Sequence, residues 1–263
     1  MSRAGAPIKG ERAAFWSAVN VVYVMLDRYE DAPDETIASL ASRLSSCVRP
    51  ARAERSRGLR RPIDRLASLA AGALIDIAVA PFTYQHIVPI VVGVNDKPDF
   101  AGGFGLHFSL SHCRKAACCV VSQHLVGIDV EGLVDPYEDL SAMCLTATER
   151  THLEGYPNRA ERICMFTRLW TREEALGKYL GCGLDESVLQ IDSLRWPAHA
   201  ASLLAVWHMD DICETAPWVK TFGLPGAYLS VCGHGRVHMT SYSLDEVLTV
   251  FISGTCSPSW ECE

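Results

Sequence analysis

The stretch Gly127-Ile128-Asp129-Val130-Glu131 decides how this chain is interpreted, because it joins an apolar run to a pair of acids. Residues 125–130 are predicted to form a strand. Side chains alternate between the two faces of a strand, so Asp129 and Glu131 should point to the same face. Such a pair is either a solvated strand end or a pair of metal ligands, and the pair alone does not decide between these interpretations.

A second acidic cluster follows about forty residues later, on a predicted helix, and reads Trp170-Thr171-Arg172-Glu173-Glu174-Ala175-Leu176-Gly177-Lys178. Trp170, Glu174 and Lys178 are spaced four residues apart and therefore share one stripe of that helix. Two carboxylates from a strand end and one from a helix form an oxygen set suited to Mg²⁺, which usually bridges to substrate phosphates. Lys178 adds a cation where phosphate charge would lie. The pattern indicates a metal site for phosphate chemistry.

The rest of the sequence predicts an α+β protein with a mixed sheet. Strands are predicted from apolar and alternating runs at 19–26, 104–111, 116–121, 125–130, 202–208, 227–232 and 236–242. Helices are predicted at 34–45, 63–79 and 159–180, with a capping box formed by Thr146 and Glu149 at a further helix start. Residues 116–121 and 125–130 are predicted to pair as a hairpin through 122–124. The order strand, long helix, strands occurs before residue 125 and again after it.

Composition is that of an ordinary globular protein, with 263 residues of which 49% are hydrophobic. A net charge of −7 argues against general binding of nucleic acid or membranes. The eleven cysteines have no zinc-type spacing, and the apolar run at 13–26 lacks the cleavage site of a signal peptide. These features predict free thiols in a cytoplasmic protein.

Seven arginines fall within residues 49–65, opposed there only by Glu54 and Asp64. One interpretation is a solvated helix face followed by a loop. The other is a docking patch for the phosphates of a nucleotide, for which the planar guanidinium fork is well suited. The sequence leaves both interpretations open.

The two acidic motifs together resemble the signature motifs of the surfactin-type 4'-phosphopantetheinyl transferases. The resemblance extends over roughly residues 15–250. Further stretches that resemble this family are Phe108-Ser109-Leu110-Ser111-His112, Arg65-Leu66-Ala67-Ser68-Leu69-Ala70-Ala71-Gly72, the helix start Thr146-Ala147-Thr148-Glu149, and the turn Asn95-Asp96-Lys97-Pro98, in which Asp96 replaces a glycine.

The resemblance implies a pseudo-dimer of two similar α+β halves with the active site in the cleft between them. Residues 1–124 would form the N-terminal half, which binds the phosphates of coenzyme A, and residues 125–263 the half that carries the metal ligands. In this family a serine of an apo acyl or peptidyl carrier protein attacks the β-phosphate of coenzyme A with the help of Mg²⁺, and 3',5'-ADP leaves. The expected protein is a cytoplasmic monomer in fatty acid, polyketide or nonribosomal peptide biosynthesis.

The resemblance also implies roles for individual residues. The metal ligands would be Asp129, Glu131 and Glu174, and the catalytic residues Glu174, as ligand or general base, and Lys178. Coenzyme A would be bound by Arg60, Arg65, Lys97, Pro98, Ser111, His112 and Lys178.

One position departs from the family pattern, because Glu173 stands where these transferases usually have a lysine. On the sequence alone, this glutamate is expected to place a further negative charge beside the metal ligands. Two functions other than transfer stay open. The first is a non-catalytic homologue that binds carrier proteins, in which Glu173 marks decay of the site. The second is another metal-dependent phosphohydrolase acting on a nucleotide.

Overall fold

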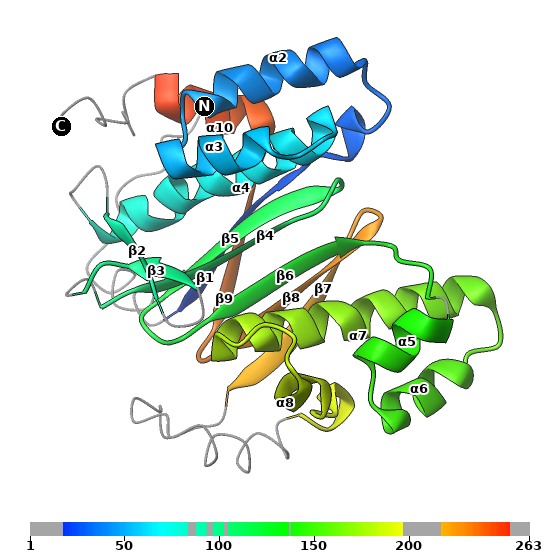
Figure 1. Ribbon diagram of the computed structural model, residues 1–263. Coiled ribbons are helices and arrows are strands. Elements are labelled where there is room, and N and C mark those ends of the chain that lie inside the picture. Colours follow the sequence, from blue (N-terminus) through cyan, green and yellow to red (C-terminus); the bar gives the residue numbers. More distant parts are fainter. Residues whose placement is uncertain are drawn as a thin grey trace.

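Two sheets lie between two layers of helices in the computed structural model, which describes residues 18–83, 88–93, 97–102, 105–136, 138–196 and 217–252 (Figure 1). The first sheet has the order β4 (His107–His112), β5 (Ala116–Ser122), β1 (Val19–Met25) and β9 (Val237–Tyr242). The second has the order β6 (Gly127–Gly132), β8 (Ala227–Gly233) and β7 (Trp218–Leu224). A short ribbon is formed by β2 (Ile90–Val92) and β3 (Pro98–Phe100).

The two sheets are built by the same succession of elements. In the first half β1 is followed by the long helix α4 (Pro62–Val79) and the antiparallel pair β4–β5, and in the second half β6 is followed by the long helix α7 (Arg159–Leu180) and the antiparallel pair β7–β8. The last strand of each half lies antiparallel to the first, as β5 does to β1 and β8 does to β6. This repeat confirms the predicted pseudo-dimer of α+β halves.

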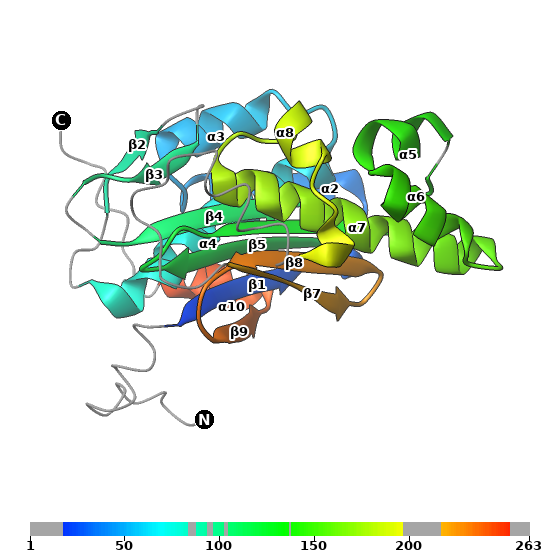
Figure 2. The same ribbon diagram turned by 90° about the horizontal axis from the view of Figure 1, so that it is seen from below.

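The predicted boundary between residues 124 and 125 falls in the connection from β5 to β6, and as a division into domains it stays a prediction. Part of the C-terminal half returns to the first sheet, because β9 pairs in parallel with β1 (Figure 2). Helix α10 (Leu244–Ile252) then packs with α4 in the same hydrophobic core.

The core follows from the alternation of side chains along β1 and β5. On β5, Ala117, Cys119 and Val121 join the core beneath α4, whereas Ala116, Cys118 and Val120 face the second sheet. Because both faces are covered, every residue of β5 is buried. The helical span Pro62–Phe82, which consists of α4 and the turn after it, is long and apolar enough to cross a membrane. However, 83% of its most apolar 18-residue segment is buried inside the protein, and this burial accounts for the composition.

The hairpin predicted from residues 116–121 and 125–130 is wrong. Both edges of β5 are already occupied by β4 and β1, so β5 has no free edge for β6. Instead, residues 123–126 carry the chain to the second sheet, where β6 pairs with β8. As a result β6 and β4 lie side by side as edge strands of different sheets (Figure 1).

The predicted helices are confirmed as α2 (Asp34–Ser45), α4 and α7, and the predicted capping box begins α6 (Ala147–Glu154). Further helices are α3 (Pro50–Arg57), α5 (Glu138–Cys144) and α8 (Glu186–Leu189). The predicted strand at 202–208 lies outside the described residues. The eight described cysteines are free thiols, as predicted.

Candidate active site

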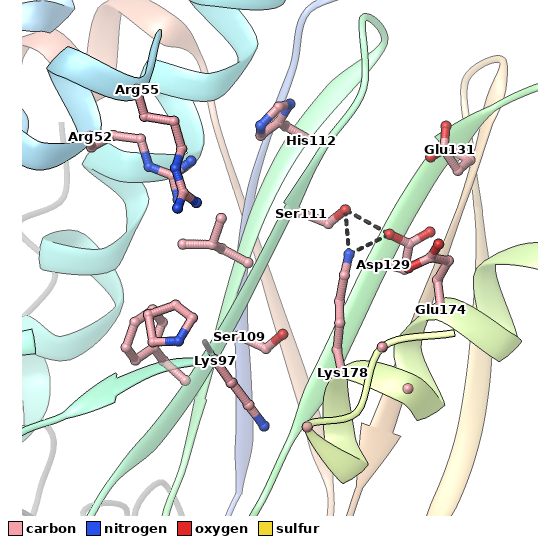
Figure 3. A pocket seen from close by; sticks show the side chains of 16 residues that line it. Arg52, Arg55, Lys97, Ser109, Ser111, His112, Asp129, Glu131, Glu174 and Lys178 are labelled. Carbon is pink, nitrogen blue, oxygen red and sulfur yellow. Dashed lines mark hydrogen bonds and ion pairs between the residues drawn. The ribbon is translucent and has the colours of Figure 1, made fainter. Parts of the chain in front are cut away.

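A cavity of about 480 Å³ lies where the two halves meet. Its walls come from β4, β6, α7, α3 and the start of β3 (Figure 3). Acidic side chains from β6 and α7 line one side, and basic side chains from α3 line the opposite side. The cavity therefore combines an acidic centre with a cationic wall.

Close packing of α7 on β6 forms the acidic side. Ile128 and Val130 of β6 point to the first sheet and are buried there, so Asp129 and Glu131 point the other way, toward α7. A side chain at Gly127 would collide with backbone atoms of Ala175 and Tyr179, so this glycine permits the close approach. Glu174 and Lys178 then face the two carboxylates of β6.

Three side chains from three elements form a closed ring of hydrogen bonds (Figure 3). The Ser111 hydroxyl on β4 donates to Asp129 Oδ1 at 2.7 Å. Lys178 Nζ on α7 donates to the same Oδ1 at 2.7 Å and to Ser111 Oγ at 3.1 Å. Asp129 Oδ2 is buried and has no hydrogen-bond partner. The ring joins the two halves directly at the acidic centre.

The carboxylates of this centre repel one another. Burial raises the pKa of Glu131 to about 8, and the Asp129 and Glu174 charges add to the rise, while Lys178 and a hydrogen bond from Trp170 oppose it. The pKa of Glu174 is also raised, by burial and by Asp129. Burial lowers the pKa of Lys178, but Asp129 and then Glu174 outweigh this, so the net shift is upward. Lys178 is therefore a firmly charged ammonium among carboxylates.

The opposite wall is basic. Arg52 and Arg55 point from α3 into the cavity, and His112 lies at the end of β4 between them and the acidic centre. Burial lowers the pKa of His112 to about 4, assisted by the charges of Arg52 and Lys178, so the imidazole is neutral near pH 7. Lys97 Nζ donates to the carbonyl oxygens of Val126 at 3.4 Å and Tyr179 at 3.5 Å.

Sequence comparison relates this chain to known transferases. The model of the 4'-phosphopantetheinyl transferase superfamily matches residues 125–224. The 4'-phosphopantetheinyl transferase AcpT of Salmonella typhi is 30% identical over 164 residues, which cover 60% of this chain and 81% of that protein. The chain belongs to the 4'-phosphopantetheinyl transferase superfamily.

Two further transferases have similar sequence identity to this chain. AcpT of Escherichia coli (strain K12) is 27% identical over 150 residues, covering 55% of this chain and 75% of that protein. The 4'-phosphopantetheinyl transferase gsp of Aneurinibacillus migulanus is 28% identical over 81 residues, covering 31% of this chain and 34% of that protein. The similarity supports the superfamily and does not single out the surfactin type.

Most residues implied by the family motifs come together in this transferase. Those that line the cavity are Lys97, Pro98, Ser111, His112, Asp129, Glu131, Glu174 and Lys178. Arg60 and Arg65 do not line it. Both are exposed, and Arg65 Nε donates to the carbonyl oxygen of Leu59 at 2.7 Å. Their contact with coenzyme A stays a prediction that this geometry does not support.

Arg52 and Arg55 were missed because the spacing of the seven arginines does not show where a helix ends and a loop begins. The stretch divides into Arg49 before α3, the helix α3 itself, a loop, and the first turn of α4, and of its arginines only Arg52 and Arg55 of α3 line the cavity. Pro50 could have indicated the helix, since proline is favoured in the first turn and lies there in α3. Arg52 and Arg55 are then about one turn apart and share a face.

The carboxylate oxygens of the acidic centre are of the kind that bind a divalent cation. No three His, Cys, Asp or Glu side chains among the described residues converge closely enough, as they stand, to enclose a metal ion. Asp129, Glu131 and Glu174 nevertheless line the same cavity with hard oxygen donors, and Asp129 Oδ2 is buried without a partner. A divalent cation would satisfy that oxygen and relieve the repulsion among the three carboxylates.

Glu173 does not lie where the sequence led us to expect. Its side chain is 1% exposed, and its pKa is raised by burial and by Glu149, so the acid belongs to the contact of α7 with α6. Glu173 does not contribute to the raised pKa of Glu131 or Glu174. The expectation of an extra charge beside the metal ligands is therefore wrong, because successive helical residues point about 100° apart.

Proposed function

We propose that this protein transfers the 4'-phosphopantetheine group from coenzyme A to a serine of an apo acyl or peptidyl carrier protein. The reaction would require Mg²⁺ and release 3',5'-ADP, as in the surfactin-type enzymes, in a cytoplasmic monomer. The observation that carries the proposal is a cavity in which an acidic centre faces a cationic wall. Coenzyme A carries a pyrophosphate and, at some distance from it, a 3'-phosphate. The acidic centre would bind the metal ion that accompanies the pyrophosphate, and the cationic wall would bind the 3'-phosphate.

The cationic wall would hold the nucleotide part of coenzyme A. Arg52 and Arg55 offer guanidinium groups that can form charge-assisted hydrogen bonds to the 3'-phosphate. His112, which is neutral near pH 7, can donate one ring N–H to a phosphate oxygen without carrying a charge. Lys97 and Pro98 border the same space, with the Lys97 ammonium held by backbone carbonyls.

Asp129, Glu131 and Glu174 would hold Mg²⁺ beside the pyrophosphate. When bound, the ion would neutralise charge that develops on the phosphates. Glu174 faces the cavity and has a raised pKa, which suits a group that accepts the proton of the carrier serine. Lys178 forms an ion pair with Asp129 and would orient the phosphate group that is transferred.

Mass spectrometry tests the proposal directly. The protein is incubated with coenzyme A, Mg²⁺ and a panel of apo carriers from fatty acid, polyketide and peptide pathways. The expected result is a mass gain of one phosphopantetheine group on at least one carrier, abolished by EDTA. The variant Asp129→Asn removes the central charge at nearly unchanged volume and should reduce transfer by a hundredfold or more, on the order expected for loss of an electrostatic contact.

Other outcomes would overturn the proposal. Breakdown of coenzyme A without any modified carrier would indicate a metal-dependent phosphohydrolase. Binding of an apo carrier without modification, and without any dependence on Mg²⁺, would indicate a non-catalytic carrier-binding homologue.

A further inference from the structure

In the hydrogen-bonded ring of Ser111, Asp129 and Lys178, the carboxylate of Asp129, a proposed metal ligand, is already paired with the ammonium of Lys178. Asp129 is 3% exposed at its side chain, and its Oδ1 accepts from both partners, whereas Oδ2 has none. Lys178 is the one described side chain that forms an ion pair with Asp129. The other lysine that lines the cavity, Lys97, donates to backbone carbonyls instead.

We propose that Lys178 and the divalent cation compete for Asp129, so that binding of the metal releases the lysine toward the substrate phosphates. This inference rests on the proposed function, because it takes Asp129, Glu131 and Glu174 as the metal ligands. It assigns to Lys178 a positioning role that precedes any contact with coenzyme A.

Electrostatics gives the reason for competition. An ammonium 2.7 Å from Asp129 Oδ1 and a divalent cation on the same carboxylate would repel each other at short range in a partly buried site. Lysine is a compact charge on a flexible four-carbon stem, so Nζ can leave while the helix stays in place. The Ser111 hydroxyl can continue to donate to Oδ1, which would keep the carboxylate oriented when Lys178 leaves.

The competition predicts that binding of the metal and binding of coenzyme A are coupled. A lysine engaged with Asp129 is directed away from phosphate, and a lysine released by the metal is free to contact phosphate. Metal binding should therefore increase the affinity for coenzyme A, and by linkage coenzyme A should increase the affinity for the metal to the same extent.

Titration calorimetry with Mg²⁺ or Mn²⁺, without coenzyme A or carrier, tests the competition. The variant Lys178→Met keeps most of the side-chain volume and removes the charge. It should bind the metal about tenfold more tightly than the wild type, or tighter still, because a competing cation is gone. The matched control is Lys97→Met, which removes a lysine from the same cavity. Lys97 donates to backbone carbonyls and does not contact Asp129, so this change removes no competitor for that carboxylate and should alter the metal affinity about twofold or less.

Thermal unfolding in EDTA provides a second readout that does not depend on activity. Lys178→Met leaves a buried carboxylate without its partner and should lower Tm, and added Mg²⁺ should restore Tm. The double variant Asp129→Asn with Lys178→Met should recover much of the loss, because the unpaired charge is removed.

Equal metal affinities for the wild type and Lys178→Met would overturn the competition while leaving the transferase proposal intact. Failure of the wild type to bind either metal would overturn both the metal site and this inference. A protein that shows the predicted metal affinities but modifies no carrier would contradict the proposed function alone.

Discussion

Glu173 and Glu174 are neighbours on α7, yet their carboxylates lie in different environments. Glu174 lines the cavity, whereas Glu173 is buried against Glu149, whose oxygens accept hydrogen bonds from Thr146 and Ser193. A lysine at this position, as is usual in the family, would lie beside the Glu149 carboxylate rather than beside the substrate phosphates. The departure from the family pattern is thus a matter of packing between helices.

The buried Glu173 should make stability depend on pH. Its pKa in the folded state is raised well above the ordinary value by burial and by Glu149. The folded protein therefore keeps a proton that the unfolded chain loses, so the free energy of unfolding should fall as pH rises above the ordinary glutamate value. Glu173→Gln should remove this loss and stabilise the protein by about 1 kcal/mol or more at pH 8, and less at pH 5.

Urea denaturation at both pH values measures this effect. The control is Glu154→Gln, which changes an exposed glutamate of α6 and should leave the difference between pH 5 and pH 8 unaltered. An identical pH dependence in the wild type and Glu173→Gln would show that Glu173 is not a protonated buried acid.

At the scale of elements, the sequence predicts those helix ends that depend on neighbouring residues alone. Helix α7 could be bounded from the sequence, because Gly181 ends it in the left-handed conformation with φ 77° and Asn158 caps its start. The pairing of β6 could not be predicted in the same way. It depends on β1 and β4 already covering both edges of β5, and β1 lies far from β5 in the sequence.

Contact between β6 and α7 provides a prediction at this scale. Gly127→Ala should push α7 away from β6, because the new methyl group would meet backbone atoms that cannot rotate aside. The expected loss of stability is about 3 kcal/mol or more, at the upper end for overpacking, with reduced metal binding because Glu174 moves with the helix. Gly102→Ala is the control, since no atom of the described residues, apart from its chain neighbours, lies within 4 Å of the added methyl. Equal urea midpoints for both variants would contradict the close approach.

At the scale of the whole molecule, the cavity depends on segments that the sequence keeps far apart. The acidic residues could be predicted as a group, because a strand and a helix each carry them at regular spacing. The basic residues could not be assigned individually, because the direction of each arginine depends on how α3 packs against α4 and on which residues follow it in the loop. Arg55 and Arg60 are both exposed, but only Arg55 lines the cavity.

That difference allows the site to be tested with two arginines from one short stretch. Arg55 lies on the wall opposite the acidic centre, where the 3'-phosphate of coenzyme A would extend if the pyrophosphate lies near Asp129. A charge-assisted hydrogen bond contributes about 1.5–3 kcal/mol, so Arg55→Gln should raise the dissociation constant for coenzyme A about tenfold or more. The loss should be much smaller for dephospho-coenzyme A, which lacks the 3'-phosphate.

Arg60→Gln is the control. It removes the same charge outside the cavity and should change the dissociation constant of either ligand about twofold or less, since solvent screens that charge. Calorimetric titrations of both variants with both ligands at one salt concentration separate these cases. Equal effects of the two substitutions would mean that only the overall charge of the arginine stretch matters, and the cavity wall would lose its role in reading the nucleotide.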